Sequence, residues 1–423
     1  MRSEGRSERS TPEKPPPLWR NRDFTLLWSG QVVSTIGTRV SSLAFPLLVL
    51  ALTHSPAKAG LVGFAQTLPF LLFYLPAGAL VDRWTRKRVM LVADAGRALA
   101  LGSLALALAL DRLTLAQIAV VAFIEGSLFV FFQLSEGAAL PHVVPKEQLP
   151  AALAQNQARD QGADLAGQPL GGFLFGIGHL VPFVFDAVSY AVSFVTLLFV
   201  RPTFQEERLH PQRHLLAEVA EGIAWLWQRP LLRAIVFLVA GSNFAFNALS
   251  LVMIVRARQF GASPALIGAM FAVFGAGAIV GAAVAPWVQR RVRTQIVVIG
   301  SLWLWAAGMA LLALAPDTLV LGAIAAVMAV AGPPFNVVVG AYQYALVPDR
   351  LQARTQSAAQ LIAWGTLPLG SLSAGFLLEG VGAIRAFLVL AGVSLGVALA
   401  ANLSRVVRDA PNVEALLAEE AAS

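Results

Sequence analysis

Long apolar stretches separated by short polar segments dominate this chain. A membrane-spanning helix needs about 20 mostly apolar residues, and the pattern predicts spans at residues 25–51, 59–81, 88–110, 114–138, 150–177, 180–200, 232–255, 265–287, 295–315, 318–345, 354–378 and 383–404. The fifth is the most polar, because it contains "AQNQARDQGADLAGQ", so it must face protein or water over much of its length. We therefore expect an all-α integral membrane protein with twelve transmembrane helices.

Composition agrees with membrane insertion. The 423 residues are 57% hydrophobic and 13% charged, whereas a soluble domain is about half apolar and a quarter charged. The net charge of +7 would suggest nucleic acid in a soluble protein, but these bases lie between the apolar stretches. The expected partners are the lipid bilayer and a small-molecule substrate, with no nucleic acid. The absence of cysteine excludes disulfides and thiolate metal sites.

The positions of the bases predict the topology. With a cytoplasmic N-terminus, 23 Lys and Arg residues fall on the inner side, five on the outer side and three within spans. Positive residues favour the cytoplasmic side, so we expect a multi-pass protein of the cell inner (plasma) membrane with both termini inside. The first 23 residues are polar, basic and Pro-rich. We expect no cleavable signal there and a disordered cytoplasmic tail.

The spans divide into two sets of six. We expect bundles at 24–200 and 232–405, a cytoplasmic linker at 201–231 and a C-terminal tail at 406–423. The linker sequence "HLLAEVAEGIAWLWQRP" predicts an amphipathic helix at the inner surface. "GALVDRW" at 78–84 resembles "GAAVAPW" at 281–287, and Gly137 matches Gly340 at the same offset of 203. These matches favour two pseudo-repeats around a central cavity over chance similarity between Gly/Ala-rich helices.

The segment "GALVDRWTRKR" carries an acid among four bases after an uncharged stretch. It resembles the signature G-x-x-x-D-(R/K)-x-G-(R/K)-(R/K) of the major facilitator superfamily, with Thr85 where that family has Gly. The resemblance implies a conformational latch formed by Gly78, Asp82, Arg83, Arg86, Lys87, Asp94 and Arg97. The alternative for Lys87 and Arg88 is that they only obey the positive-inside rule. Asp94 and Arg97, three residues apart on one helix, could instead pair locally.

The fifth stretch reads "LAGQPLGGFLFG". It partly resembles the Gly-Pro signature of the drug:proton antiporter branch that holds macrolide-efflux and enterobactin-exporter-like proteins, and the matching residues are Gly167, Pro169, Gly171 and Gly172. The two interpretations are an antiporter hinge and a tightly packed helix.

Charged residues inside spans are candidates for function because their burial is costly. Arg39 and Glu125 lie near the middle of the first and fourth spans, which line the cavity in the superfamily. We expect them to face each other and to exchange a proton, or alternatively to form a permanent ion pair. The further coupling candidates are Glu136, Asp160 and Asp164.

The second half has no acid within its expected spans. Its candidates for the substrate cavity are Asn243, Asn247, Asn336, Tyr342, Gln343 and Trp364. No Walker or zinc-binding pattern is present, so we expect no enzyme activity, no metal and no cofactor, with a proton gradient as the energy source. We therefore expect a monomeric, proton-coupled secondary transporter that exports hydrophobic or amphipathic compounds of the drug or siderophore type. The alternatives are an importer or uniporter on the same fold, and a membrane binding or signalling protein.

Overall fold

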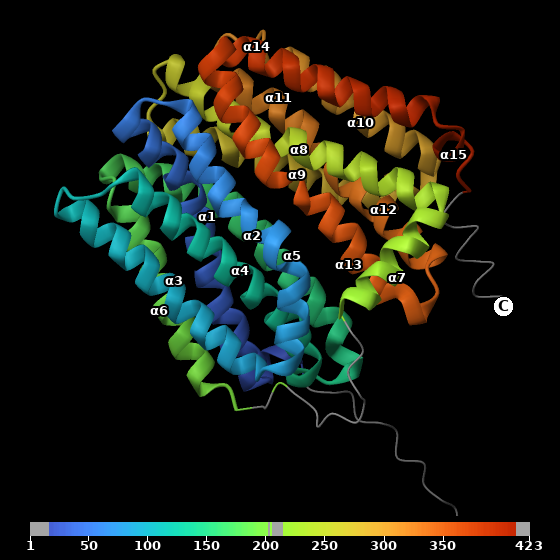
Figure 1. Ribbon diagram of the computed structural model, residues 1–423, viewed down its shortest axis with the longest axis horizontal. Helices are drawn as coiled ribbons and strands as arrows, with labels where there is room; N and C mark the ends of the chain where they lie inside the picture. The colour runs from blue at the N-terminus through green and yellow to red at the C-terminus, as the bar shows by residue number, and fades with distance from the viewer. Residues whose placement is uncertain (1–16, 202–203, 205–214, 412–423) are drawn as a thin grey trace, which may run out of the picture.

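The computed structural model describes residues 17–201, 204 and 215–411. Within them, helices form two groups that lie side by side (Figure 1). The first group contains α1 to α6, and the second contains α8 to α14. The expected all-α membrane fold is confirmed.

The first group is built from six long helices: α1 (Arg22–Thr53), α2 (Pro56–Arg83), α3 (Arg86–Ala109), α4 (Leu115–Val143), α5 (Leu149–Ile177) and α6 (Val181–Phe199). Side-chain oxygens fix several helix starts, since Ser55 accepts a hydrogen bond from the Lys58 N–H and Thr114 from the Gln117 N–H. Part of the expected disordered tail is ordered. Leu18–Arg20 form the short 3-10 helix η1, and the buried Leu18 anchors it; residues 1–16 lie outside the described residues.

The second group contains α8 (Pro230–Gln259), α9 (Pro264–Arg291), α10 (Thr294–Leu312), α11 (Thr318–Val330), α12 (Gly332–Leu346), α13 (Asp349–Gly365) and α14 (Leu367–Leu403), followed by α15 (Arg405–Arg408). The expected span 318–345 is divided into α11 and α12 just before Pro333 and Pro334, which lack the N–H that a continuous helix needs. Gly382 interrupts α14 with a φ of 80°, a conformation that glycine adopts at little cost.

Ten helical segments of the described chain are long and apolar enough to cross a membrane, compared with the twelve expected. Two features account for the difference. The polar α5 is not among the ten, and the last segment, Arg354–Leu403, is 50 residues long. At about 1.5 Å per residue, such a helix is more than twice as long as a bilayer core is thick. Gly382 interrupts the helix inside that segment, and Figure 1 shows α14 turning back at the top of the view.

The helix boundaries support one of the two repeat matches. Leu115 opens α4 and Thr318 opens α11, which are 203 residues apart, as the Gly137–Gly340 match requires. Pro56 and Pro264 open α2 and α9, and these are 208 residues apart. The match of 78–84 with 281–287 is therefore displaced by five residues, because equivalent positions in the two helices differ by 208. By this register Arg290, rather than Ala285, corresponds to Asp82, and the second half still has no matching acid.

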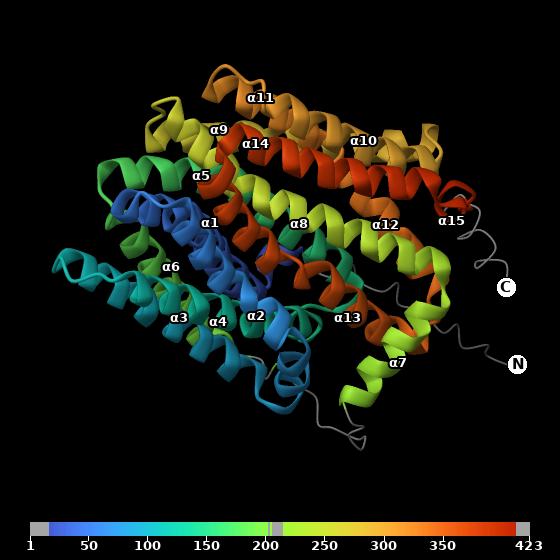
Figure 2. The same cartoon turned by 45° about the horizontal axis from the view of Figure 1, so that its top comes forward.

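The most extensive contacts between the halves are those of α2 with α14 and of α5 with α9, and α2 also contacts α13. Glycines bring the backbones close, since a Cβ on Gly60 would lie 2.7 Å from the Gly375 Cα and one on Gly172 would lie 2.9 Å from the Gly268 Cα. Both contacts lie toward the same end of the bundle, which carries the loops after α1, α5 and α8 and which we call the closed end. The opposite end, where α1 begins and α6 ends, lacks such glycine contacts between the halves among the described residues, and we call it the open end (Figure 2).

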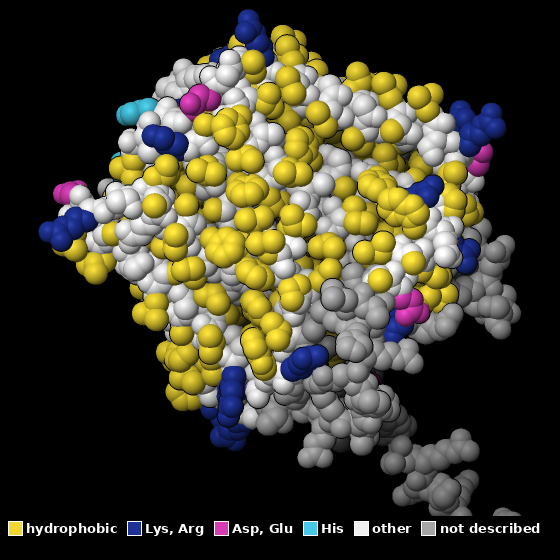
Figure 3. Space-filling model, in the orientation of Figure 1, with side chains coloured by type: hydrophobic (Ala, Val, Ile, Leu, Met, Phe, Trp, Pro, Cys, Tyr) yellow, Lys and Arg dark blue, Asp and Glu magenta, His cyan; other side chains and the backbone are white. Residues whose placement is uncertain are grey.

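Apolar side chains cover the middle of the visible face, and most Lys and Arg side chains lie toward its margins (Figure 3). This distribution is what a bilayer requires. At the open end, the linker helix α7 (Leu215–Gln228) packs on α13, where Glu221 forms a 2.5 Å ion pair with Arg354. The amphipathic helix is thus held by the second half, while residues 202–203 and 205–214 of the expected linker lie outside the described residues.

Candidate functional site

A buried ion pair lies in the centre of the first half. Nη2 of Arg97 on α3 is 2.6 Å from Oε1 of Glu125 on α4, and their side chains are only 2% and 4% exposed. An isolated charge at this depth would be very costly, and a paired one less so. Both residues lie near the middle of their helices, so the pair is far from either end of the bundle.

Hydroxyl groups from two further helices complete this pair. The Tyr190 hydroxyl of α6 lies 3.1 Å from the same Glu125 oxygen and contacts Arg97 directly. Arg97 also donates to the Thr38 hydroxyl of α1 at 3.2 Å, and its guanidinium lies 3.9 Å from the centre of the Tyr190 ring. We call Thr38, Arg97, Glu125 and Tyr190 the central cluster. It ties four helices of the first half together.

A second buried acid lies beside the central cluster. Asp186 of α6 is fully buried and accepts hydrogen bonds from Ser41 at 2.5 Å and from Ser189 at 3.0 Å. It lies five residues inside α6 rather than at its first residue, so it does not cap the helix. The sequence pattern did not indicate the depth of this carboxyl group or its proximity to Arg97.

The expected pairing of Arg39 with Glu125 is wrong. Arg39 instead pairs with Asp164 of α5, with 2.6 Å between Nε and Oδ1. The two side chains are 39% and 41% exposed, in contrast to the sealed Arg97–Glu125 pair. The rotation of α1 explains the difference, since Thr38 faces α3 and α6 while Arg39 faces α5.

Two other candidates, Glu136 and Asp160, share an arginine nearer the open end. Arg159 bridges Glu136 at 2.5 Å and Asp160 at 2.9 Å. This group joins α4 to α5. Glu136 is therefore paired and separate from Glu125, although both lie on α4.

The local pair expected between Asp94 and Arg97 is absent from the ion pairs of the described residues. Asp94 is fully buried and accepts a 2.6 Å hydrogen bond from Ser193, which in turn accepts one from Gln31. Both side chains leave α3 on the same side, but each contacts different partners. Their spacing of three residues therefore did not determine their partners.

The expected latch residues near the open end make contacts within the first half. Arg86 donates to the carbonyls of Ala138 and Phe204, at 2.8 and 2.9 Å, and Lys87 donates to the Val200 carbonyl at 2.5 Å. The Val200 carbonyl lies at the C-terminal end of α6, where a cation is favoured. Arg83 is exposed, and a Cβ on Gly78 would have open space around it. The side chain of Asp82 lies outside the described residues, so its expected role stays a prediction.

The helix-5 motif is a packing surface. Added Cβ atoms on Gly167 and Gly171 would collide with Arg39 and Val40 of α1, and one on Gly172 would collide with α9. Pro169 lies within the continuous helix α5, close to Gly268. Of the two interpretations, the structure supports close helix packing at this motif.

A polar contact between the halves lies at the closed end. Glu379 of α14 accepts hydrogen bonds from the Ser55 hydroxyl at 2.5 Å and from the Ala57 N–H at 3.0 Å. The N-terminus of a helix favours an anion, and here the anion comes from the other half of the molecule. The sequence pattern did not indicate this contact, because the partners are more than 300 residues apart.

The six cavity candidates of the second half do not form one site. Asn247 lines a pocket between the halves and accepts a 2.9 Å hydrogen bond from Ser371. Trp364 packs against Phe70 and Tyr74 of α2. Asn243 donates a hydrogen bond to the Ala363 carbonyl, and the Tyr342 hydroxyl donates one to the Pro411 carbonyl. Asn336 is exposed on α12.

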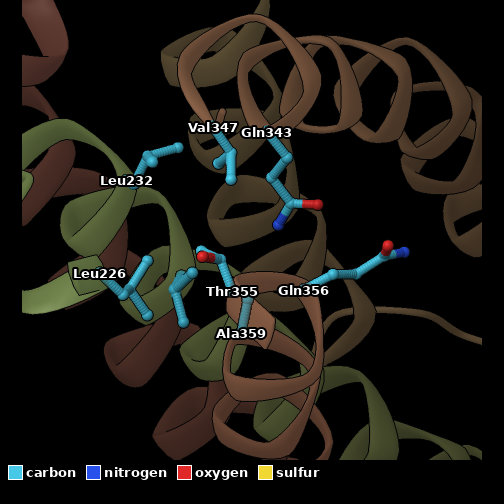
Figure 4. Close-up of a pocket in the computed structure, with 8 residues that line it drawn as sticks. Leu226, Leu232, Gln343, Val347, Thr355, Gln356 and Ala359 are labelled. Carbon is cyan, nitrogen blue, oxygen red and sulfur yellow. The ribbon is translucent and has the colours of Figure 1, made fainter. Parts of the chain in front are cut away.

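Gln343, the remaining candidate, lines a separate pocket at the open end of the second half. Figure 4 shows its amide pointing toward Thr355 of α13, with Leu226 and Leu232 on the opposite side. The pocket has a volume of about 380 Å³ with the solvent at its mouth included, and it lies between α7, α8, α12 and α13. It belongs to one half, so Gln343 is not part of the pocket that Asn247 lines.

Comparison with known proteins places the chain in a broad group of transporters. A family described as transmembrane secretion effector, of the major facilitator type, matches residues 15–420. The MFS-type transporter YfiS of Bacillus subtilis is 27% identical over 392 residues, covering 88% of this chain and 91% of its own. The multidrug efflux pump Tap of Mycolicibacterium fortuitum is 24% identical, with 84% and 88% covered. Macrolide efflux protein A of Streptococcus pyogenes is 24% identical, with 62% and 65% covered.

Solved structures share the fold at low sequence identity. A bacterial homologue of the lysosomal transporter Spinster, inward-facing and occupied, has a TM-score of 0.70 at 14% identity, covering 91% of this chain and 96% of its own. A D323A mutant of the nucleoside transporter NupG has a TM-score of 0.68 at 16% identity, with 90% and 98% covered.

Proposed function

Because this chain belongs to the transmembrane secretion effector family of the major facilitator transporters, we propose that it is a proton-coupled exporter of hydrophobic or amphipathic small molecules. The efflux pumps among its relatives favour export of drug-type compounds. The two helix groups would move against each other, so that each end of the bundle opens in turn.

The observation that supports proton coupling is the sealed Arg97–Glu125 pair. Protonation of Glu125 would remove the negative charge that Arg97 faces and would leave the guanidinium with the Thr38 and Tyr190 hydroxyls. Since these residues come from four helices, the change in charge reaches α1, α3, α4 and α6 together. A protonation step at this site can therefore alter how the first half packs.

The other charged groups suggest a route to this carboxyl group. The Glu136–Arg159–Asp160 group lies nearest the open end, and the exposed Arg39–Asp164 pair lies near the middle of α1 and α5. Protons arriving from the open end would meet these groups before Glu125. By the positive-inside rule, the open end with its bases would face the cytoplasm of an inner-membrane protein. We propose a monomer that needs no resident cofactor.

Reconstituted liposomes test this proposal. The protein would be sealed with a pH-sensitive dye inside, a pH gradient would be imposed, and macrolides, cationic dyes and siderophores would be added in turn. We expect at least one compound to speed proton movement through the wild type but not through Glu125→Gln. The matched control is Glu147→Gln, because Glu147 is exposed in the turn before α5.

Proton movement that persists in Glu125→Gln would contradict the assignment of Glu125. Substrate movement without protons in the wild type would contradict proton coupling altogether and would indicate a uniporter.

A further inference from the structure

A pocket between the halves lies close to the central cluster. Its volume is about 530 Å³ with the solvent at its mouth included, and residues of α1, α2, α8 and α14 line it. Its polar lining residues are Ser42, Gln66, Thr67, Asn247, Ser250 and Ser371, and none of its lining residues is charged. The remaining lining residues are small or apolar, Phe45, Leu251 and Ile254 among them. This combination suits an uncharged amphipathic ligand, since a charged ligand would find no counter-ion on this wall.

The hydrogen bonds within the pocket wall determine which donors and acceptors remain available to a ligand. The Ser42 hydroxyl donates to the Arg39 carbonyl at 2.8 Å, and the Thr67 hydroxyl donates to the Gly63 carbonyl at 2.8 Å. Both oxygens therefore remain as acceptors. Pro46, also in the wall, has no N–H for the Ser42 carbonyl, which adds an acceptor. The Asn247 Oδ1 accepts from Ser371, so its Nδ2 is the donor that this side chain can present.

Gln66 connects this wall to the central cluster. Its Nε2 lies 3.4 Å from Oε2 of Glu125, the carboxylate oxygen that does not bind Arg97. A glycine at 126 allows this approach, because a Cβ there would collide with the Gln66 carbonyl oxygen. With Nε2 directed at Glu125, the Oε1 of the same amide is the group that a ligand donor can reach.

We propose that this pocket binds an uncharged ligand rich in hydroxyl and amide groups, and that Gln66 is the positioning residue through which the ligand changes the environment of Glu125. The coupling part rests on the proposed function. A ligand N–H or O–H that donates to Gln66 polarises or moves the amide, and so alters its bond to the Glu125 carboxylate. Ligand affinity should then depend on whether Glu125 is protonated, and the dependence should pass through Gln66.

Equilibrium binding tests the pocket without any gradient. The purified protein in lipid nanodiscs would be titrated with radiolabelled chloramphenicol, an uncharged compound with an amide and two hydroxyls, and with ethidium, a permanent cation. We expect saturable chloramphenicol binding, weakened by Ser371→Leu, and no competition from ethidium. Absence of saturable chloramphenicol binding, or competition by ethidium at comparable concentration, would overturn the ligand class.

The pH dependence of that binding tests the role of Gln66. For the wild type we expect the Kd to depend on pH, by up to about tenfold per pH unit if one proton is linked to binding. Gln66→Leu should flatten this dependence as Glu125→Gln does. Ser250→Ala, in the same wall but on α8, should alter affinity and keep the pH dependence.

Two outcomes separate this inference from the proposed function. If Gln66→Leu weakens binding and keeps the full pH dependence, Gln66 only lines the pocket and the coupling link is wrong. If binding behaves as expected but wild-type liposomes move no protons with chloramphenicol, the proposed function fails while the pocket stands.

Discussion

At the scale of single residues, the most consequential feature is that Arg97 and Glu125 each depend on the other. Both are almost completely buried, and the hydroxyls around them cannot replace a missing charge. Loss of one partner from a buried pair leaves an uncompensated charge, whereas loss of both leaves only polar groups.

A double-mutant cycle tests this dependence. We expect Arg97→Met to destabilise the folded protein by about 3–5 kcal/mol, and Arg97→Met combined with Glu125→Gln to recover most of that loss. The measurement is the unfolding temperature of all four proteins in the same detergent. Additive effects of the two substitutions would show that the side chains are not energetically coupled.

The glycines of the α5–α9 contact give a second prediction. A Cβ on Gly172 would lie 2.9 Å from Gly268, whereas one on Gly176, a turn further along α5, would have no atom within 4 Å. Gly172→Ala should therefore separate the helices at the closed end, at a cost of about 1–3 kcal/mol. With Cys introduced at Ser250, which is exposed in the wall of the pocket between the halves, maleimide should react faster in this variant.

Gly176→Ala is the control, and the chain supplies no competing cysteine. Equal labelling rates in the two variants would mean that the Gly172–Gly268 contact does not hold the closed end together.

At the scale of helices, the contact between α14 and the start of α2 joins the halves through one carboxylate. Because Glu379 accepts the Ala57 N–H, Glu379→Ala should speed hydrogen exchange of the backbone amides that begin α2. Glu221→Ala, which removes an ion pair at the open end, should leave those amides unchanged. Unchanged exchange in Glu379→Ala would show that the contact is not formed in the membrane.

Helix positions were largely predictable from the sequence, and the partners of the charged residues were not. A membrane-spanning helix is mostly apolar along its length, so most spans are visible in the sequence as apolar stretches. The α5 stretch is less apolar, because it contains charged residues that pair with other helices. The partner of Arg39 depends on the rotation of α1, which no local pattern records. The same holds for Gln66 and Tyr190, which the sequence pattern did not single out. Arg97 was noted, but its local spacing to Asp94 favoured the wrong partner.

At the scale of the whole molecule, the structure is one arrangement of a transporter whose two halves we propose to move against each other. Close backbone approaches of the two halves lie at the closed end, in the Gly60–Gly375 and Gly172–Gly268 contacts. In the proposed function, the charge state of Glu125 influences which end is open, so the central cluster is connected to the movement of the halves. A test of this connection does not require a known substrate.

The most direct measurement is a pair of distances between spin labels on the two halves, recorded as a function of pH. Labels on cysteines at Lys146 and Arg290 report on the open end, and labels at Arg112 and Pro316 report on the closed end; all four positions are exposed. We predict that acidification changes the two distances in opposite directions in the wild type, and that Glu125→Gln abolishes both changes. The same opposite changes with pH in Glu125→Gln would contradict the claim that this buried carboxyl group controls the movement.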